Sequence, residues 1–312
     1  MSERQLSVRA TDRHSFPVRG LVDLSRATYQ STPLAVTEIR PQVFSFVGAG
    51  GTVTAVGGSL GCAVIDTGYR PRVDEIRKAI ASALRQPPRW LINTHWHFDH
   101  TDGNPTFAEN GATIVAHTNC RARLSQDQYV PSLEWSVSAS ARSAWPVLTF
   151  DAPVAIDLGP QALQLITQAP AHTDGDVAVW LPSANVLVMG DLMTNGSYPI
   201  IDESSRGSLR GMVRAVEGLL GLVNSDTVVV PGHGPIGNRD SLLGFRDMLR
   251  TIEGRIQPLI ASGSPVAGIL AAAPTADFDR VWGRGYVTGD IFVRMILAGF
   301  GLTEEAKKSS AA

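Results

Sequence analysis

The stretch His-Trp-His-Phe-Asp-His at residues 95–100 constrains this chain more than any other part of its sequence. It begins two residues after the apolar run Trp-Leu-Ile at residues 90–92, which predicts a buried strand. Because side chains two positions apart in an extended backbone point the same way, His95 and His97 can converge on one metal ion. The turn into the next helix can then bring Asp99 and His100 to a second ion. Sites of this kind form at strand ends in α/β proteins.

Two more histidines lie in predicted loops at strand ends. His172 lies in the sequence Pro-Ala-His-Thr-Asp-Gly-Asp and His233 in Pro-Gly-His-Gly-Pro. Five of the seven histidines therefore fall in such loops, whereas a random distribution would scatter them more widely. For one of these histidines alone, a surface or core position is the simpler interpretation. The cluster as a whole predicts a metal site.

Residues 1–40 are predicted to form an irregular N-terminal arm. After this arm, glycine turns bound short apolar runs, which predict strands, and helical spacing of apolar residues begins at Pro71. A second, similarly ordered series of strands then precedes a helix and a last strand. The expected strands are 43–47, 52–56, 62–66, 89–93, 147–150, 154–158, 162–168, 177–181, 186–190 and 227–230. One expected helix begins at residue 71, and two others span residues 102–110 and 209–222.

Two β-rich halves, each covered by helices, predict an α/β fold of four layers, an αββα sandwich. We expect a catalytic domain at residues 41–250 and a helical C-terminal extension at 251–312. The extension should pack on the catalytic domain, because Phe278, Trp282 and Phe292 would otherwise expose much apolar surface.

Charge and cysteine content narrow the possible partners. The chain has 27 Lys and Arg against 29 Asp and Glu, a net charge of −2, and no long run of one sign. Nucleic acid is therefore not an expected partner.

Cys62 and Cys120 lack zinc-ligand spacing and are expected to be buried, reduced thiols. No apolar stretch is long enough for a membrane span or signal peptide, so we expect a cytoplasmic protein with a small-molecule substrate; homo-oligomerisation stays open.

The motifs together resemble the metallo-β-lactamase superfamily over roughly residues 40–250. They are HxHxDH, the later HTDGD and PGHGP segments, and Asp191 in Met-Gly-Asp. The resemblance implies one metal on His95, His97 and His172, a second on Asp99, His100 and His233, and a bridge through Asp191. Such nitrogen and oxygen donors suit two Zn²⁺ ions, with manganese and iron as alternatives. His117 and the segment 274–279 are also similar to a broad bacterial group of such hydrolases.

A complete ligand set for two metals without a nucleic-acid surface leads us to expect hydrolysis of a small ester or lactone by a metal-bridging hydroxide, with Asp99 and Asp191 as the catalytic carboxylates. The charges of two divalent ions, two carboxylates and one hydroxide sum to about +1, which favours a polarised carbonyl. Thioesters and amides are further candidate substrates. The alternatives are a phosphodiesterase or nuclease, a weak β-lactamase and, least favoured, a metal-stabilised binding protein without turnover.

Three departures from known members of this superfamily refine the expectation. β-Lactamases with a cysteine ligand to the second metal carry it where this chain has Asp191, so antibiotic resistance is not the expected role. Redox diiron relatives generally place Glu at the position of His97. The glyoxalase II pattern after the last histidine is absent, since Gly and Pro follow His233.

Several other side chains are candidates for supporting roles. Asp66 ends a strand, where it can orient a ligand imidazole or simply form a turn. His117 is a candidate for a similar role or for helix capping. Thr194, Asn195 and Tyr198 are candidates for hydrogen-bond donors to an oxyanion. Phe44, Phe46 and Val53 are candidates for an apolar wall of the substrate pocket or for the hydrophobic core. The aromatic residues Trp135, Trp145, Trp282 and Tyr286 are candidates for the pocket mouth or for the core.

Overall fold

Seven strands form the first sheet of the protein, whose computed structural model describes residues 16–18, 20–168 and 170–303. Their order is β1-β2-β3-β4-β5-β6-β9. The strands from β1 to β4 are antiparallel to their neighbours, and those from β4 to β9 are parallel. The bounds are β1 (Ala35–Arg40), β2 (Val43–Val47), β3 (Val53–Val56), β4 (Cys62–Ile65), β5 (Pro88–Ile92), β6 (Thr113–His117) and β9 (Leu148–Phe150).

The second sheet has five strands in the order β10-β11-β12-β13-β14. Only its last pair, β13 with β14, is parallel. A separate ribbon pairs β7 (Gln128–Val130) with β8 (Trp135–Val137). The bounds are β10 (Val154–Asp157), β11 (Ala162–Thr167), β12 (Val177–Leu181), β13 (Val186–Val188) and β14 (Val228–Val230).

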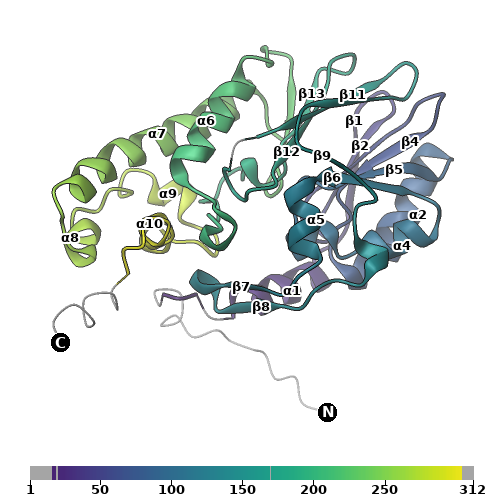
Figure 1. Cartoon of the computed structure of the whole chain (residues 1–312). Coiled ribbons are helices and arrows are strands. Elements are labelled where there is room, and N and C mark those ends of the chain that lie inside the picture. Colours follow the sequence, from purple (N-terminus) through teal and green to yellow (C-terminus); the bar gives the residue numbers. More distant parts are fainter. Residues whose placement is uncertain (1–15, 19, 169, 304–312) are drawn as a thin grey trace.

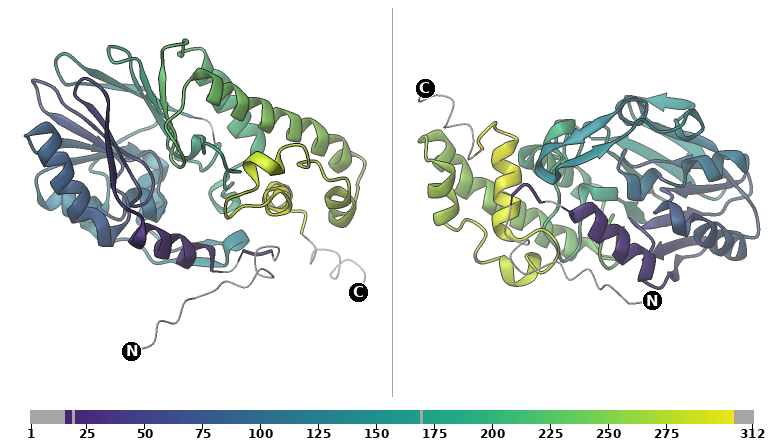
Figure 2. Two further views of the ribbon diagram at one scale, coloured as in Figure 1. Left: turned by 180° about the vertical axis from the view of Figure 1, so that it is seen from behind. Right: turned by 90° about the horizontal axis from the view of Figure 1, so that it is seen from below.

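Helices lie on both outer sides of the two sheets (Figures 1 and 2). Helices α2 (Val73–Leu84) and α4 (Asn104–Glu109) pack on the first sheet, and α6 (Leu209–Leu220) and α7 (Arg239–Ala261) pack on the second. Alternate side chains of each strand serve the two faces, as the strand period of two requires. In β4, for example, Ile65 faces the second sheet and Val64 faces α2. The αββα prediction is confirmed.

The predicted irregular arm is wrong for its described part. Residues Leu21–Ser31 form helix α1, and Ala35–Arg40 form β1, which pairs with β2 at the edge of the first sheet. The periodic signal is weak because α1 buries only Leu21 and Val22, and β1 has no buried residue. Residues 1–15 lie outside the described part. The views agree that α1 lies beside the β7–β8 ribbon at one edge of both sheets (Figures 1 and 2).

The C-terminal part is helical, with α8 (Val266–Ala271), α9 (Asp279–Trp282) and α10 (Gly289–Ala298) following α7. A boundary at residue 250 would cut α7, which continues to Ala261. Phe292 of α10 shares one apolar cluster with Phe245 of α7 and Trp180 of β12, so these helices and the second sheet have a common core. None of the helices in the described part combines the length and apolar character that crossing a membrane requires.

Candidate metal centre

The histidine-rich segment connects β5 to the short helix α3 (Phe98–Thr101). A reciprocal pair of buried amides holds this connection in place. Asn93 Nδ2 donates to Asn104 Oδ1 at 3.0 Å, and Asn104 Nδ2 donates to Asn93 Oδ1 at 2.8 Å. Because Asn104 begins α4, the pair ties the end of the strand to the next helix. The predicted helix at 102–110 is thus shorter and is preceded by one turn of α3.

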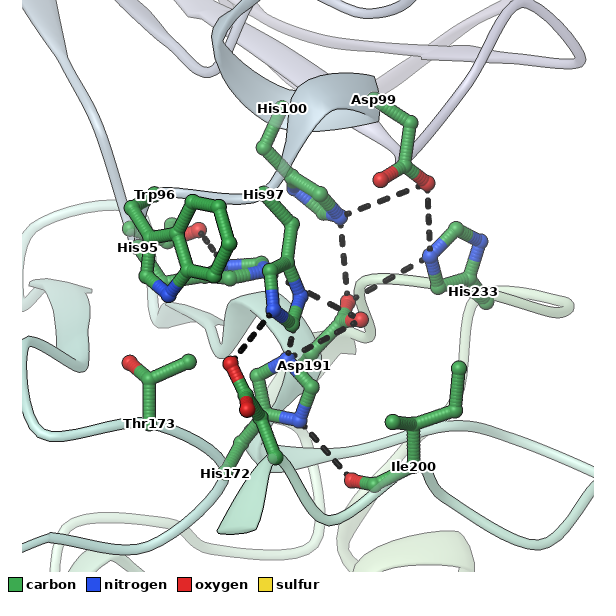
Figure 3. Close-up of polar contacts among 12 residues, drawn as sticks. His95, Trp96, His97, Asp99, His100, His172, Thr173, Asp191, Ile200 and His233 are labelled. Atoms are coloured by element: carbon green, nitrogen blue, oxygen red, sulfur yellow. Dashed lines mark hydrogen bonds and ion pairs between the residues drawn. The ribbon is translucent and has the colours of Figure 1, made fainter. Parts of the chain in front are cut away.

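His95, His97, His172 and Asp191 form a first group of buried side chains, each offering one nitrogen or oxygen atom within 4.8 Å of the others. Nδ1 of His97 lies 3.0 Å from Nε2 of His172. His172 comes from the loop between β11 and β12, and Asp191 from the turn after β13. Two sheets therefore contribute to one cluster, as Figure 3 shows.

Asp99, His100 and His233 form a second group within the same limit of 4.8 Å. Oδ2 of Asp99 lies 3.2 Å from Nε2 of His233 and 3.9 Å from Nε2 of His100. His233 follows β14, and its backbone forms a bridge with Thr194, close to Asp191 in the chain. The second group therefore also joins loops from the two sheets.

Asp191 lies between the two groups and turns one carboxylate oxygen toward each (Figure 3). Its Oδ2 lies 3.7 Å from Nε2 of His172 and 4.0 Å from Nε2 of His95. Its Oδ1 lies 3.2 Å from Nε2 of His100 and 3.5 Å from Nε2 of His233. A carboxylate that spans two cations would have this orientation.

Three buried atoms at the centre have no partner in hydrogen-bond geometry among the described residues. They are Nε2 of His95, Nε2 of His100 and Oδ1 of Asp191. Buried polar atoms are nearly always paired, and leaving one unpaired costs about 1–3 kcal/mol. Divalent cations, one in each group, would satisfy these atoms, because imidazole nitrogen and carboxylate oxygen are their usual ligands. The residues present therefore fit a metal.

Asp66 supports both groups from outside. Its Oδ2 accepts hydrogen bonds from Nδ1 of His100 at 2.8 Å and from the Thr94 hydroxyl at 2.7 Å. The same hydroxyl lies 3.1 Å from Nδ1 of His95, from which it accepts, since its own proton goes to Asp66. Both histidines thus direct Nε2 to the centre. The backbone of Asp66 has a left-handed conformation with φ 62°, and its hydrogen bonds support the orienting interpretation.

The other two histidines of the first group are oriented in a similar way. Oδ2 of Asp202 accepts a hydrogen bond from Nε2 of His97 at 3.0 Å, which leaves Nδ1 facing the centre. The Ile200 carbonyl accepts from Nδ1 of His172 at 2.8 Å. Sequence reasoning missed Asp202, because the residue lies in a loop 105 positions after His97 and belongs to no recognisable motif.

The pKa values of His95 and His172 in the first group shift in the opposite direction to that of His233 in the second. Burial, together with the neighbouring His97, lowers the pKa of His172 to about 4. Burial also lowers the pKa of His95 well below its usual value. Burial also lowers the pKa of His233, but the carboxylates of Asp191 and Asp99 have the larger effect and raise the pKa of His233 to about 10. The second group therefore has a strong negative field, which attracts cations.

A cavity of about 270 Å³ opens onto both groups. His97, Asp99, Asp191 and His233 line its metal end. The remaining wall is mostly apolar or aromatic and comes from segments far apart in the sequence. Its larger side chains are Leu21, Val22, Tyr29, Phe98, Leu133, Trp135, Tyr198, Ile200, Tyr286 and Val287.

Tyr29 of α1 reaches the second group, a contact that no feature of the sequence predicts. Its hydroxyl donates to Oδ2 of Asp99 at 3.0 Å, and its ring stacks on His233 with centroids 6.3 Å apart. Burial and the Asp99 charge raise the pKa of Tyr29 well above 10, so the hydroxyl keeps its proton at neutral pH. Tyr29 falls in the segment predicted to be irregular, 70 positions before Asp99.

Each of the three candidate oxyanion donors already donates to an internal partner. The Tyr198 hydroxyl donates to Asp279 at 2.8 Å, and the Asn195 amide donates to the Pro235 carbonyl at 2.8 Å. The Thr194 hydroxyl donates to the backbone of Ser197 at 2.7 Å. His117 caps α5 (Thr118–Leu124) by accepting from the Asn119 backbone at 3.0 Å, which confirms the capping interpretation.

The aromatic and apolar candidates divide between pocket and core. Trp135 and Tyr286 line the cavity, whereas Trp145 and Trp282 pack against the large core cluster. The interpretation of Phe44, Phe46 and Val53 as a substrate wall is wrong. Phe46 and Val53 are buried in the core under α2, and Phe44 packs against that core, so none of the three lines this cavity.

Comparisons with known proteins agree with this geometry. The chain is 28% identical over 225 residues to the 2,4-dinitroanisole O-demethylase subunit alpha of Nocardioides sp. (strain JS1661), an alignment of 69% of this chain and 63% of that subunit. It is 29% identical over 249 residues to the hydroxyacylglutathione hydrolase of Rhodospirillum rubrum, which aligns 75% of this chain and 86% of the relative. This chain thus spans less than two thirds of the demethylase subunit.

A solved structure shares the fold. The metallo-beta-lactamase from Pontibacter korlensis superposes with a TM-score of 0.60 at 23% identity, over 70% of this chain and 99% of the other. The sequence profile of the Metallo-beta-lactamase superfamily matches residues 48–233, which is more than half of the chain and includes both groups of candidate ligands. The chain therefore belongs to the metallo-beta-lactamase superfamily.

Proposed function

We propose that this protein is a dinuclear zinc hydrolase that cleaves small ester or lactone bonds. The orientation of Asp191 carries the proposal, since one of its oxygens faces each group of candidate ligands. The first ion would be held by His95, His97 and His172, the second by Asp99, His100 and His233, and Asp191 would be shared.

Two zinc ions, when bound, supply an acidified water and stabilise negative charge on a carbonyl oxygen. The chain itself then needs no serine or cysteine nucleophile, and Cys62 and Cys120 are both buried. Asp99 and Asp191 line the cavity and are the carboxylates placed to accept a proton and return it to the leaving oxygen. Manganese or iron would suit the same donors.

The chemistry of the cavity favours carbonyl substrates over phosphodiesters. Within the described part of the chain, no Lys or Arg lines the cavity, so a phosphate would find no cation apart from the metals. Similarity to a protein named hydroxyacylglutathione hydrolase also supports hydrolysis of acyl compounds. Similarity to an O-demethylase subunit makes 2,4-dinitroanisole a compound worth testing alongside.

Metal analysis with a substrate panel tests this proposal. Protein expressed with ample zinc should contain close to two ions per chain, and strong chelation should abolish turnover. The panel comprises esters, lactones, thioesters, β-lactams, phosphodiesters and 2,4-dinitroanisole. His97→Ala should lower ester turnover by more than the roughly 10–100-fold expected of an outer-shell change, whereas the control His117→Ala should not. Full activity without metal, or a preference for phosphodiesters, would contradict the proposal.

A further inference from the structure

Helix α1 forms one wall of the cavity beside the metal groups. Leu21, Val22, Ser25 and Tyr29 line the cavity. These positions are spaced by one, three and four residues, so they share one face of the helix. Figure 2 shows α1, in purple, at the edge of the molecule where the two sheets meet.

Contacts from other segments fix this wall in place. Nη1 of Arg72 donates to the backbone carbonyls of Tyr29 at 2.6 Å and Thr32 at 2.8 Å, at the C-terminal end of α1. The Thr28 hydroxyl is hydrogen-bonded to the Tyr286 hydroxyl of the C-terminal part. The wall is therefore held to both halves of the chain.

Outside the metal end, no charged residue of the described part of the chain lines the cavity. Leu133, Trp135 and Val287 add apolar surface to the lining of the cavity. Among the described residues that line it, Asp99 and Asp191 are the only acidic ones, and none is Lys or Arg. A charged substituent in the apolar part would lose its hydration without gaining a partner, which is costly.

We propose that the substrates are neutral esters or lactones with an apolar aryl or alkyl group, and that α1 selects them. The inference rests on the proposed function and names its substrate class. Leu21 and Val22 contact the apolar group, while Tyr29 holds Asp99 through the hydroxyl hydrogen bond. Acyl groups on carriers with several charges, such as glutathione, are poor substrates because the described residues that line the apolar part of the cavity offer their charges no partner.

A matched substrate series tests the selection. The zinc-loaded protein is assayed with phenyl hexanoate and with its analogue that ends in a carboxylate, monophenyl adipate. The neutral ester should have a kcat/KM at least about tenfold higher. A tenfold difference requires only about 1.4 kcal/mol, the cost of placing the carboxylate in the apolar part of the cavity without a partner. Equal values for the two esters would overturn the inference.

Three variants assign this preference to α1. Ser25 is half-buried and lines the cavity, so Ser25→Lys adds the missing cation there, and the ratio of charged to neutral turnover should rise about tenfold or more. Gln30→Lys is the control, because Gln30 is exposed on the same helix and does not line the cavity. A shift in Gln30→Lys as large as that in Ser25→Lys would contradict the role of α1. Tyr29→Phe should lower kcat more than it raises KM.

A binding measurement separates this inference from the proposed function. Hexanophenone, a neutral ketone that cannot be hydrolysed, should bind the metal-free protein, and 4-hexanoylbenzoate should bind at least about tenfold more weakly. Calorimetry reports both affinities without turnover. If no ester is hydrolysed but the ketone binds selectively, the proposed reaction fails and the apolar pocket stands. If esters are hydrolysed without this preference in either assay, the pocket inference fails.

Discussion

Asp66 and His100 are joined by a 2.8 Å hydrogen bond between Oδ2 and Nδ1, and both side chains are almost completely shielded from solvent. The same oxygen also accepts from Thr94, which in turn contacts His95. One carboxylate therefore sets the tautomer of a histidine in each group, and neither imidazole can rotate without losing a buried partner.

Asp66→Asn should weaken metal binding at both groups by roughly 10–100-fold, because an amide is a poorer acceptor and replaces one oxygen with a donor. Competition with a chromophoric chelator measures the two affinities. Asp74→Asn is the control, since Asp74 is exposed on α2. Unchanged affinities in Asp66→Asn would show that the carboxylate orients neither histidine.

Asp191→Ser should leave one metal ion per chain instead of two. The substitution removes both the negative charge and the two oxygens that face the groups, while His95, His97 and His172 stay in place. Native mass spectrometry counts the ions, and ester turnover should fall more than the metal content does. The control Asp151→Ser, at an exposed bend, should retain two metal ions per chain. Two ions in Asp191→Ser would exclude a bridging role for Asp191.

The buried Cys62 thiol should make the protein less stable as the pH rises from 9 toward 12. Burial raises the pKa of Cys62 from 9.0 to about 12, so the native thiol stays protonated where the unfolded one ionises. The stabilisation is complete below pH 9 and is lost as the pH approaches 12. Urea midpoints at pH 8 and pH 10.5 measure this. In Cys62→Ala the urea midpoint should fall less between pH 8 and pH 10.5 than in the unmodified protein. An equal fall in both proteins would show that Cys62 does not cause the loss of stability.

Phe292→Ala should destabilise the protein by about 3–5 kcal/mol. Phe292 of α10 is fully buried and stacks on Tyr198 with ring centroids 5.0 Å apart. Phe300 lies shortly after the same helix and is 56% exposed, so Phe300→Ala should change stability by no more than about 0.5 kcal/mol. Chemical denaturation of both variants checks the pair. If both variants lost a similarly small amount of unfolding free energy, α10 would not belong to the core.

The four layers and most of the seven clustered residues could be predicted because their signals are local, whereas only the resemblance to the superfamily points to Asp191. His95, His97, Asp99 and His100 lie within six positions of one another, and the apolar alternation around them reports the strands. Helix α1 gave little signal because its inner face carries polar residues as well as Leu21 and Val22.

The supporting side chains could not be predicted for a different physical reason. Tyr29 contacts Asp99 and Asp202 contacts His97 only because the fold brings together residues 70 and 105 positions apart. A single hydrogen bond over such a separation imposes no spacing or periodicity on the sequence. Contacts of this kind become visible only when the three-dimensional arrangement is known.

The division of the candidate ligands between the two sheets has a thermodynamic consequence. Four of them follow β5 in the first sheet, whereas His172, Asp191 and His233 lie in loops of the second. With metal bound as proposed, the ions act as cross-links between halves that otherwise meet through an apolar interface. The unfolded chain cannot reproduce this arrangement, so free metal shifts the equilibrium toward the native state, by about 2.7 kcal/mol at a concentration of 100 times Kd. The melting temperature of this protein is then a function of the zinc concentration in which it is measured.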